Sequence, residues 1–173
     1  MLFSCVQKYS ITHKYVYSHF GYNLKATDMQ AAVGCAQLKK FPSFIERRIH
    51  NFDRLYGKLK VIEDKVILPE RMEGSRPSWF GFLITCREGV DRSDVVRYIE
   101  SHGVQTRMLF AGNLIRHPCF DGMRKEGRGY RTVSDLSVTD RIMKDTFWVG
   151  VYPGMTDEMI DYMAKVIIDA VSD

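Results

Sequence analysis

The sequence predicts an α+β domain in which a short mixed sheet is covered by helices and preceded by an N-terminal arm. Capped helical patterns alternate with short β-rich runs over residues 27–173. Apolar stripes at 43–60 and 156–171 should cover one face of that sheet. Residues 1–26 show little periodicity, so we expect an irregular arm there. With 45% hydrophobic and 27% charged residues, the 173-residue chain is globular in composition, which excludes a disordered or collagenous protein.

Two helices are expected first. Thr27 with Gln30 three positions later forms a capping box, the pattern that starts a helix. Pro42 should end that helix, and Ser43 with Glu46 should start a second one that continues to about residue 60. The basic side chains of this second helix lie away from its apolar stripe, and we expect them to face water: Arg47, Arg48, His50, Arg54 and Lys58.

The remaining chain mixes strands and helices. Short β-rich runs predict strands at 66–68, 79–86, 104–109 and 146–151. Asp91 should cap a helix that ends at Gly103, and a shorter helix is expected near 135–144. Residues 110–134 read as a long loop of the kind that is functional or mobile. Thr156 should cap the last helix, whose expected inner stripe is Met159, Met163, Val166, Ile167 and Ala170.

Composition narrows the function classes. The net charge of +4 permits nucleic acid but does not demand it, and no RNP-like aromatic motif supports a nucleic-acid module. We expect no membrane span, because no apolar run approaches 18 residues, and without a secretion signal we expect a cytoplasmic protein. No metal or iron–sulfur site is expected within this chain, because no CxxC pattern joins its cysteines: Cys5, Cys35, Cys86 and Cys119.

Five positions are candidates for binding chemistry. Asn23, in a Gly-Tyr-Asn turn before a helix start, can donate to a phosphate, although its spacing favours a purely local turn. Arg107 can bind a phosphate, and Asn113 can hydrogen-bond to a sugar hydroxyl. An ordinary solvated loop explains the presence of these two residues about equally well. Arg141 precedes an aromatic strand that suits a sugar nucleotide, but an ordinary surface arginine is commoner. For Phe82, core packing is the default role.

Several motifs together resemble one family. HKYVYSHFGYNLKATDMQAAVGCAQLKKFPSFIERR looks like the central stretch of the DegT/DnrJ/EryC1/StrS sugar aminotransferases. Three further blocks resemble the CDP-4-keto-6-deoxyglucose 3-dehydratase branch, which serves dideoxysugar and lipopolysaccharide O-antigen biosynthesis: WFGFLIT, GVQTRMLFAGNLIRHP and TDRIMKDTFWVGVYPG. The similarity covers residues 13–171 and implies the small C-terminal domain of the aspartate-aminotransferase-like fold, in a dimer.

The resemblance also implies a cofactor and partners. The branch uses pyridoxamine 5′-phosphate, related to pyridoxal 5′-phosphate, whose amine condenses with the 4-keto group of a sugar nucleotide before the 3-hydroxyl leaves. A 2Fe–2S cluster and a flavin-containing reductase then deliver electrons in full-length members. By the same resemblance, Asn23 contacts the cofactor phosphate of the other subunit. Substrate-binding roles fall to Lys25, Phe82, Arg107, Asn113 and Arg141.

The sequence departs from the family in one respect that decides what function we expect. The large cofactor domain that precedes this segment in family members is not in the sequence, and the catalytic side chains and cluster cysteines belong to it. We therefore expect the chain to be the C-terminal portion of such an enzyme, with no catalytic residue of its own and no activity alone. The alternative is a non-catalytic interaction protein that dimerises or associates with a cofactor domain.

Overall fold

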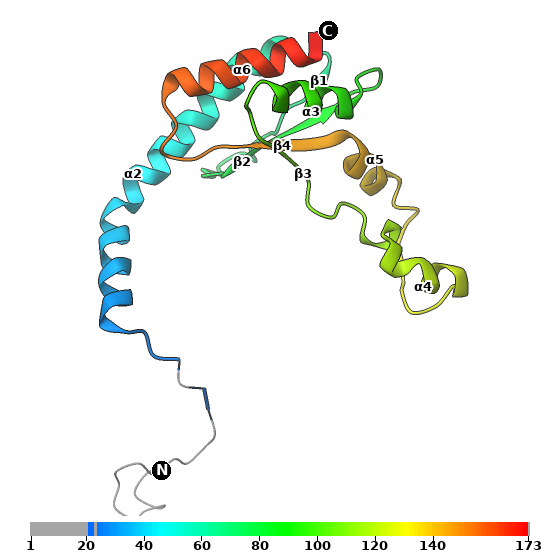
Figure 1. The fold of residues 1–173 in the computed structure, drawn as a ribbon, viewed down its shortest axis with the longest axis horizontal. Helices are drawn as coiled ribbons and strands as arrows, with labels where there is room; N and C mark the ends of the chain where they lie inside the picture. Colours follow the sequence, from blue (N-terminus) through cyan, green and yellow to red (C-terminus); the bar gives the residue numbers. More distant parts are fainter. Residues whose placement is uncertain (1–20, 23, 173) are drawn as a thin grey trace, which may run out of the picture. The chain divides into compact units, whose positions relative to one another are not determined.

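The computed structural model describes residues 21–22 and 24–172, and the chain divides into two compact units at 1–39 and 40–173. The second unit is an α+β domain built on one sheet (Figure 1). Its four strands are antiparallel throughout, so the expectation of a mixed sheet is wrong. In spatial order they are β1 (Val66–Ile67), β2 (Gly81–Cys86), β4 (Thr146–Gly150) and β3 (Thr106–Met108).

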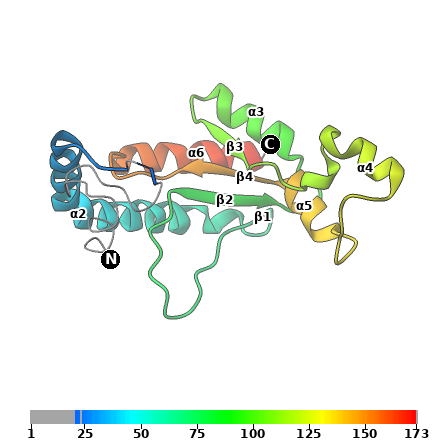
Figure 2. The same cartoon turned by 90° about the horizontal axis from the view of Figure 1, so that it is seen from below.

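Alternation along the strands gives the sheet a buried face. Phe82 and Ile84 of β2 pair with Val149 and Phe147 of β4, and all four side chains are fully buried. Helix α6 (Asp157–Ser172) and the C-terminal half of α2 (Asp28–Leu59) contribute to this same core, on one side of the sheet (Figures 1 and 2). Each such side chain contributes about 1.5–3 kcal/mol relative to exposure, so this packing is what holds the unit together.

Helix α2 differs from expectation at its middle. It continues through Pro42, so the predicted end there and the second start at Ser43 are wrong. Proline fits the helical φ angle and removes one backbone donor. The Ser43 hydroxyl does not cap a new helix but donates to the carbonyl of Lys40 at 2.8 Å, within the same helix. The predicted capping box at the start of α2 is confirmed, with reciprocal bonds between Thr27 and Gln30.

The other predicted caps also form. The Asp91 carboxylate accepts from the N–H groups of Ser93 at 2.6 Å and Asp94 at 3.3 Å, and α3 (Arg92–Ser101) follows. Gly103 lies beyond its end in the left-handed region, at φ +77°. The 110–134 segment is more ordered than a plain loop, because it holds α4 (Asp121–Glu126) and two short 3-10 turns. Helix α5 (Ser137–Asp145) leads into β4.

The last helix begins as expected, but its stripe is shifted. The hydroxyl of Thr156 accepts from the N–H of Met159 at the start of α6. Met159 itself is 50% exposed, whereas Ile160 and Ala164 are buried. The expected stripe was therefore partly wrong, because it began one residue too early on the helical wheel. No helix among residues 21–22 and 24–172 is long and apolar enough to cross a membrane.

Candidate functional site

A cavity lies beside the end of the β3–β4 pairing, which is formed by Thr106 and Val149, and α6 contributes to its wall. Its volume is about 560 Å³, within the range of ligand pockets. Among the described residues that line it, Arg107 alone carries an ionised side chain, and the other side chains are mostly aromatic or sulfur-containing. Its walls are formed by Gly103, Val104, Gln105, Arg107, Trp148, Gly150, Tyr152, Met155, Met159, Tyr162 and Met163.

The indole of Trp148 is held in place on the face of the sheet opposite the core. Its Nε1–H donates to the carbonyl of Met108 at 3.0 Å, which bridges β4 to β3. On the β2 side the ring lies over Gly81, where a Cβ atom would come within 2.7 Å of the indole. Phe80 packs edge-on against the ring at 5.5 Å between centroids. The register places Arg107 directly beside Trp148 on this face.

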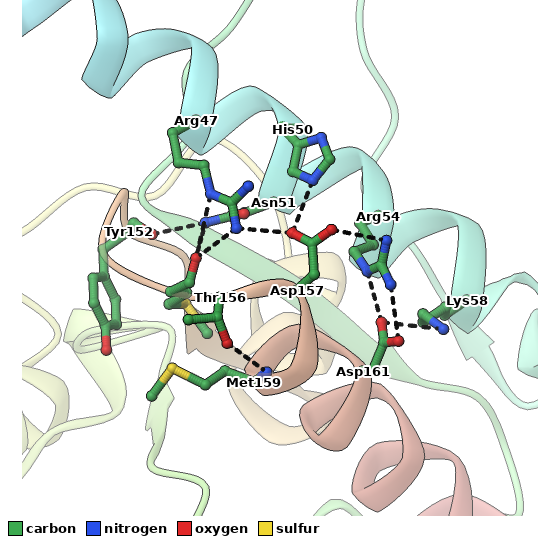
Figure 3. A network of polar contacts seen from close by, with 11 residues as sticks. Arg47, His50, Asn51, Arg54, Lys58, Tyr152, Thr156, Asp157, Met159 and Asp161 are labelled. Carbon is green, nitrogen blue, oxygen red and sulfur yellow. Dashed lines mark hydrogen bonds and ion pairs between the residues drawn. The ribbon is translucent and has the colours of Figure 1, made fainter.

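The turn after β4 forms another wall of the cavity, and side chains of α2 hold it by hydrogen bonds (Figure 3). The fully buried Asn51 donates through Nδ2 to the carbonyl of Tyr152 at 2.9 Å and to that of Met155 at 3.4 Å. Arg47 also donates to the Met155 carbonyl, at 2.9 Å. Sequence reasoning missed Asn51. The available signal was its place directly before Phe52 of the expected apolar stripe, because a buried amide requires partners.

Four of the five basic side chains expected to face water pair with carboxylates of α6, which corrects their expected placement: Arg47, His50, Arg54 and Lys58. The fifth, Arg48, donates instead to Ser78 at 3.4 Å. Asp157 lies 2.8 Å from Arg47, 3.1 Å from His50 and 3.1 Å from Arg54. Asp161 lies 2.7 Å from Arg54 (Figure 3). Hydrogen bonding from Arg54 lowers the pKa of Asp161 to about 2, and His50 is the main cause of a lowered pKa at Asp157. The network therefore fixes the start of α6, where Met159 enters the cavity wall.

The side chain of Asn113 is buried and hydrogen-bonded within the protein. It is 3% exposed, and its Nδ2 donates to Asp140 Oδ1 at 2.7 Å. Arg116 forms two hydrogen bonds to the same carboxylate, and these two partners lower the pKa of Asp140, with Arg116 the larger cause. The observed contacts tie the start of the 110–134 segment to α5. A sugar hydroxyl reaches Asn113 only if this arrangement changes.

Phe82 and Arg141 are placed in quite different surroundings. Phe82 is fully buried and packs against Phe52 at 4.7 Å between ring centroids, so its contacts in this structure are those of the core. Arg141 is exposed on α5 beside a second cavity, of about 620 Å³. The walls of that cavity carry both signs of charge: Arg87, Glu88, Asp91, Arg92, Arg141, Lys144 and Asp145.

The last two predicted residues belong to the first unit. Lys25 is exposed there, and Asn23 lies outside the described residues. Within the second unit, the structure does not gather the candidates into one site, because Arg107 and Arg141 line different cavities and Phe82 and Asn113 are buried elsewhere.

The described residues do not by themselves fit a pyridoxamine phosphate site. The Arg107 cavity has no carboxylate to hold the pyridine nitrogen and no second cation for the phosphate. In the Arg141 cavity, the Asp91 carboxylate is already used as a helix cap. No cluster of three metal-ligating side chains occurs in the described part of the chain. The described residues can therefore supply only part of such a site.

Comparison with known proteins supplies the context. The profile of the DegT/DnrJ/EryC1/StrS aminotransferase family matches residues 2–168. The lipopolysaccharide biosynthesis protein RfbH of Salmonella typhimurium is 51% identical over 155 residues, which are 88% of this chain and 34% of that protein. The dTDP-4-dehydro-2,6-dideoxy-D-glucose 3-dehydratase of Saccharopolyspora spinosa is 44% identical over 162 residues, 92% of this chain and 34% of that enzyme.

A solved structure agrees with these relatives. The GDP-4-keto-6-deoxy-D-mannose-3-dehydratase of E. coli, with bound hydrated PLP, superposes with a TM-score of 0.72 at 25% identity, over 90% of this chain and 39% of that one. The fold is therefore that of part of an aminotransferase-like enzyme. The chain spans about a third of the length of the curated relatives it matches. It belongs to the DegT/DnrJ/EryC1/StrS aminotransferase family.

Proposed function

Because the chain belongs to this family, we propose that it forms the C-terminal portion of a sugar-nucleotide 3-dehydratase dependent on pyridoxamine or pyridoxal phosphate. The substrate in this proposal is a CDP-4-keto-6-deoxyhexose, and the pathway is cytoplasmic synthesis of dideoxysugars for lipopolysaccharide. The observation that carries it is the 51% identity with a lipopolysaccharide biosynthesis protein, together with 44% identity with a 3-dehydratase. Asn23 and Lys25 keep their proposed roles at the shared cofactor and substrate site, as does Arg141 near the sugar nucleotide.

The geometry of the described residues supports a dependent role. The second unit has its own core and a shaped cavity, so it can position a ligand. The described residues give the wall of this cavity neither an acid for the pyridine nitrogen nor a lysine or histidine. Such a portion binds and orients, while proton transfer requires groups from the rest of the enzyme. We therefore propose that the chain is inactive alone and that a reductase serves only the complete enzyme.

A second candidate function is that of an interaction protein without catalysis. Its supporting observation is the exposure of two apolar side chains one turn apart on the same face of α2, with Met29 81% and Val33 63% exposed. Apolar side chains grouped on a helix mark an association surface. In this reading the chain dimerises or joins a cofactor domain, but the assembly performs no dehydration.

Cofactor binding separates the two functions. The purified chain is mixed with pyridoxamine phosphate, with and without the N-terminal two thirds of the Salmonella relative, and the cofactor absorbance spectrum is recorded. We expect a spectral change only when both polypeptides are present. A stable assembly of the two that leaves the cofactor spectrum unchanged would favour the interaction protein. A change with this chain alone would contradict its dependence on a partner.

A further inference from the structure

We propose that residues 111–133 form a flap that swings away from α5 about two joints, Phe110 and Leu136, and that Asp140 is the latch that holds it closed. The flap carries α4 and both short 3-10 turns. Both views show α4 beyond α5, away from the sheet (Figures 1 and 2). This motion lies within the second unit and is independent of the proposed function.

Both joints have a strained backbone. Among the described residues other than glycine, only Phe110 and Leu136 have a positive φ, at +47° and +60°. This left-handed region is unfavourable for bulky side chains, so a change of conformation at either residue relieves strain. One joint precedes the flap and the other follows it. Rotation at both therefore redirects the flap while β3 and α5 keep their positions, which is how hinge residues act.

The flap has little apolar packing to hold it in place. None of its side chains belongs to the buried hydrophobic core of the second unit, whose members skip from Val104 to Phe147. Two of its large apolar side chains, Leu114 and Val133, are 58% and 87% exposed. Segments with few buried apolar contacts open at a smaller cost in free energy than the core does. The flap can therefore open while the sheet and its covering helices stay folded.

One carboxylate joins the flap to α5. Asp140 Oδ1 accepts from Asn113 Nδ2 at 2.7 Å and from Arg116 Nε at 3.0 Å, and Asp140 Oδ2 accepts from Arg116 Nη2 at 2.5 Å. Among the described residues, every hydrogen bond that a flap side chain makes outside the flap ends on Asp140. The Asn113 N–H adds a contact of 3.3 Å to Met143 Sδ, a weak acceptor. Because charge-assisted hydrogen bonds are the strong ones, closure depends mainly on Asp140.

Helix α5 is a fixed support for this latch. Its last residue directly precedes β4, a central strand of the sheet. Arg92 of α3 donates to the Met143 carbonyl at 2.7 Å and to the Thr146 carbonyl at 3.4 Å, which ties the end of α5 to α3. Asp140 therefore stays with the sheet when the flap moves.

The flap has contacts of its own that preserve its shape. Arg124 donates to the carbonyls of Ile115 and His117, and His117 Nε2 lies 2.7 Å from the carbonyl oxygen of Ala111. Arg124 also pairs with Asp121 at the start of α4. These contacts link the 3-10 turns to α4, so we expect the flap to move as one body.

Opening changes which groups are accessible. In the closed flap the Asn113 amide is buried, and both this amide and the Arg116 guanidinium are bound to Asp140. Asp140 therefore acts as an internal ligand that occupies two hydrogen-bonding groups, and its release exposes both together. A ligand from solution favours the open flap only if it binds that state better than the closed one. The closed flap is in this sense an autoinhibitory contact built into the fold.

The experiment measures the distance between the flap and the sheet by energy transfer in the full chain. Cys119 is an exposed residue of the flap and accepts a thiol-reactive fluorophore. Cys5 and Cys35 are replaced by serine so that they do not react. Cys86 is buried and stays unlabelled in the folded protein.

Trp148 is the donor, with Trp79→Phe removing the second tryptophan. In this parent protein we expect one main donor–acceptor distance and a minor second population, which is the open flap. Asp140→Asn should enlarge the minor population about tenfold, because loss of one charge-assisted contact shifts an equilibrium by roughly that factor. Near-ultraviolet dichroism checks that the variant keeps its fold.

Glu126→Gln is the matched control, because Glu126 pairs with Arg128 at 2.7 Å inside the flap and its loss leaves the latch intact. We expect this control to have the same distance distribution as the parent. An equal increase of the minor population in both variants would show a general effect of lost charge and overturn the latch. An unchanged distribution in Asp140→Asn, with native dichroism, would overturn it as well.

Hydrogen exchange distinguishes a swinging flap from local unfolding. In Asp140→Asn the amides of 111–117, where the flap meets α5, should exchange faster than in the parent. The amides of α4 should keep their protection, because a flap that moves as one body retains its internal hydrogen bonds. Loss of protection in α4 in the same variant would show that the segment unfolds, and would overturn the flap.

Discussion

The contact between Gly81 and Trp148 gives the sharpest stability prediction. A Cβ added at position 81 lies 2.7 Å from the indole, and its cross-strand partner Gly150 has open space at the same place. In Gly81→Ala the ring must move or the strands must separate, which costs about 1–3 kcal/mol for overpacking of this kind. In Gly150→Ala nothing is displaced, and reduced freedom of the unfolded chain stabilises by about 0.4–1 kcal/mol.

The assay is urea unfolding of both variants and the wild type, followed by far-ultraviolet dichroism, with Trp148 emission recorded in the Trp79→Phe background. In thermal unfolding of the same variants, a loss of 1 kcal/mol would lower Tm by about 2–4 °C for a chain of this size. Gly81→Ala should have a lower free energy of unfolding than the wild type and should shift the emission of Trp148. Gly150→Ala should do neither. If the two alanine variants proved equally stable with the same emission, the indole would not be held against β2 as we describe.

Three further predictions concern other parts of the second unit. Acid should weaken the contact of α6 with α2: the pKa of Asp161 is lowered to about 2, so its stabilising effect is complete above its ordinary pKa near 3.8 and is lost as the pH falls toward 2. Urea midpoints measured between pH 5 and pH 2 should therefore fall more steeply in the wild type than in Asp161→Asn, and parallel curves would refute this. Burial raises the pKa of the Cys86 thiol to about 11, so a thiol reagent at pH 8 should label the exposed Cys35 but reach Cys86 only after unfolding, as peptide mass spectrometry can check. Asn113→Ala should lower the free energy of unfolding by about 1 kcal/mol through loss of its bond to Asp140 and should speed hydrogen exchange in 110–134; unchanged exchange would argue against the anchoring role.

Features set by neighbouring residues were predictable from the sequence. The caps made by Thr27 and Asp91 depend on hydrogen bonds two or three positions away, and both form. Strands at β2 and β4 followed from dense β-branched and aromatic runs. The end predicted at Pro42 is wrong: a proline inside a helix costs about 3 kcal/mol, and here the helix continues through it into a C-terminal half that is buried in the core.

Features set by distant contacts were not predictable. Asn51 bonds the carbonyl of Tyr152, 101 positions away, and no local pattern encodes that partner. The sequence offered no reason to prefer Arg107 over Asn113 as a binding residue. The structure distinguishes them, because one lines a cavity without an ion pair and the other is buried against Asp140. Family resemblance points to segments of the chain, whereas side-chain surroundings decide which residues are accessible.

The proposal that this chain completes a sugar-nucleotide dehydratase is tested most directly by substrate-dependent chemistry on the cofactor. The chain is combined with the N-terminal two thirds of the Salmonella relative and loaded with pyridoxamine phosphate. CDP-4-keto-6-deoxyglucose is then added, and the cofactor absorbance is followed in a single turnover. We predict a sugar-dependent spectral change that neither polypeptide gives alone. A complex that assembles and binds the cofactor, yet whose spectrum does not respond to the sugar, would contradict the account.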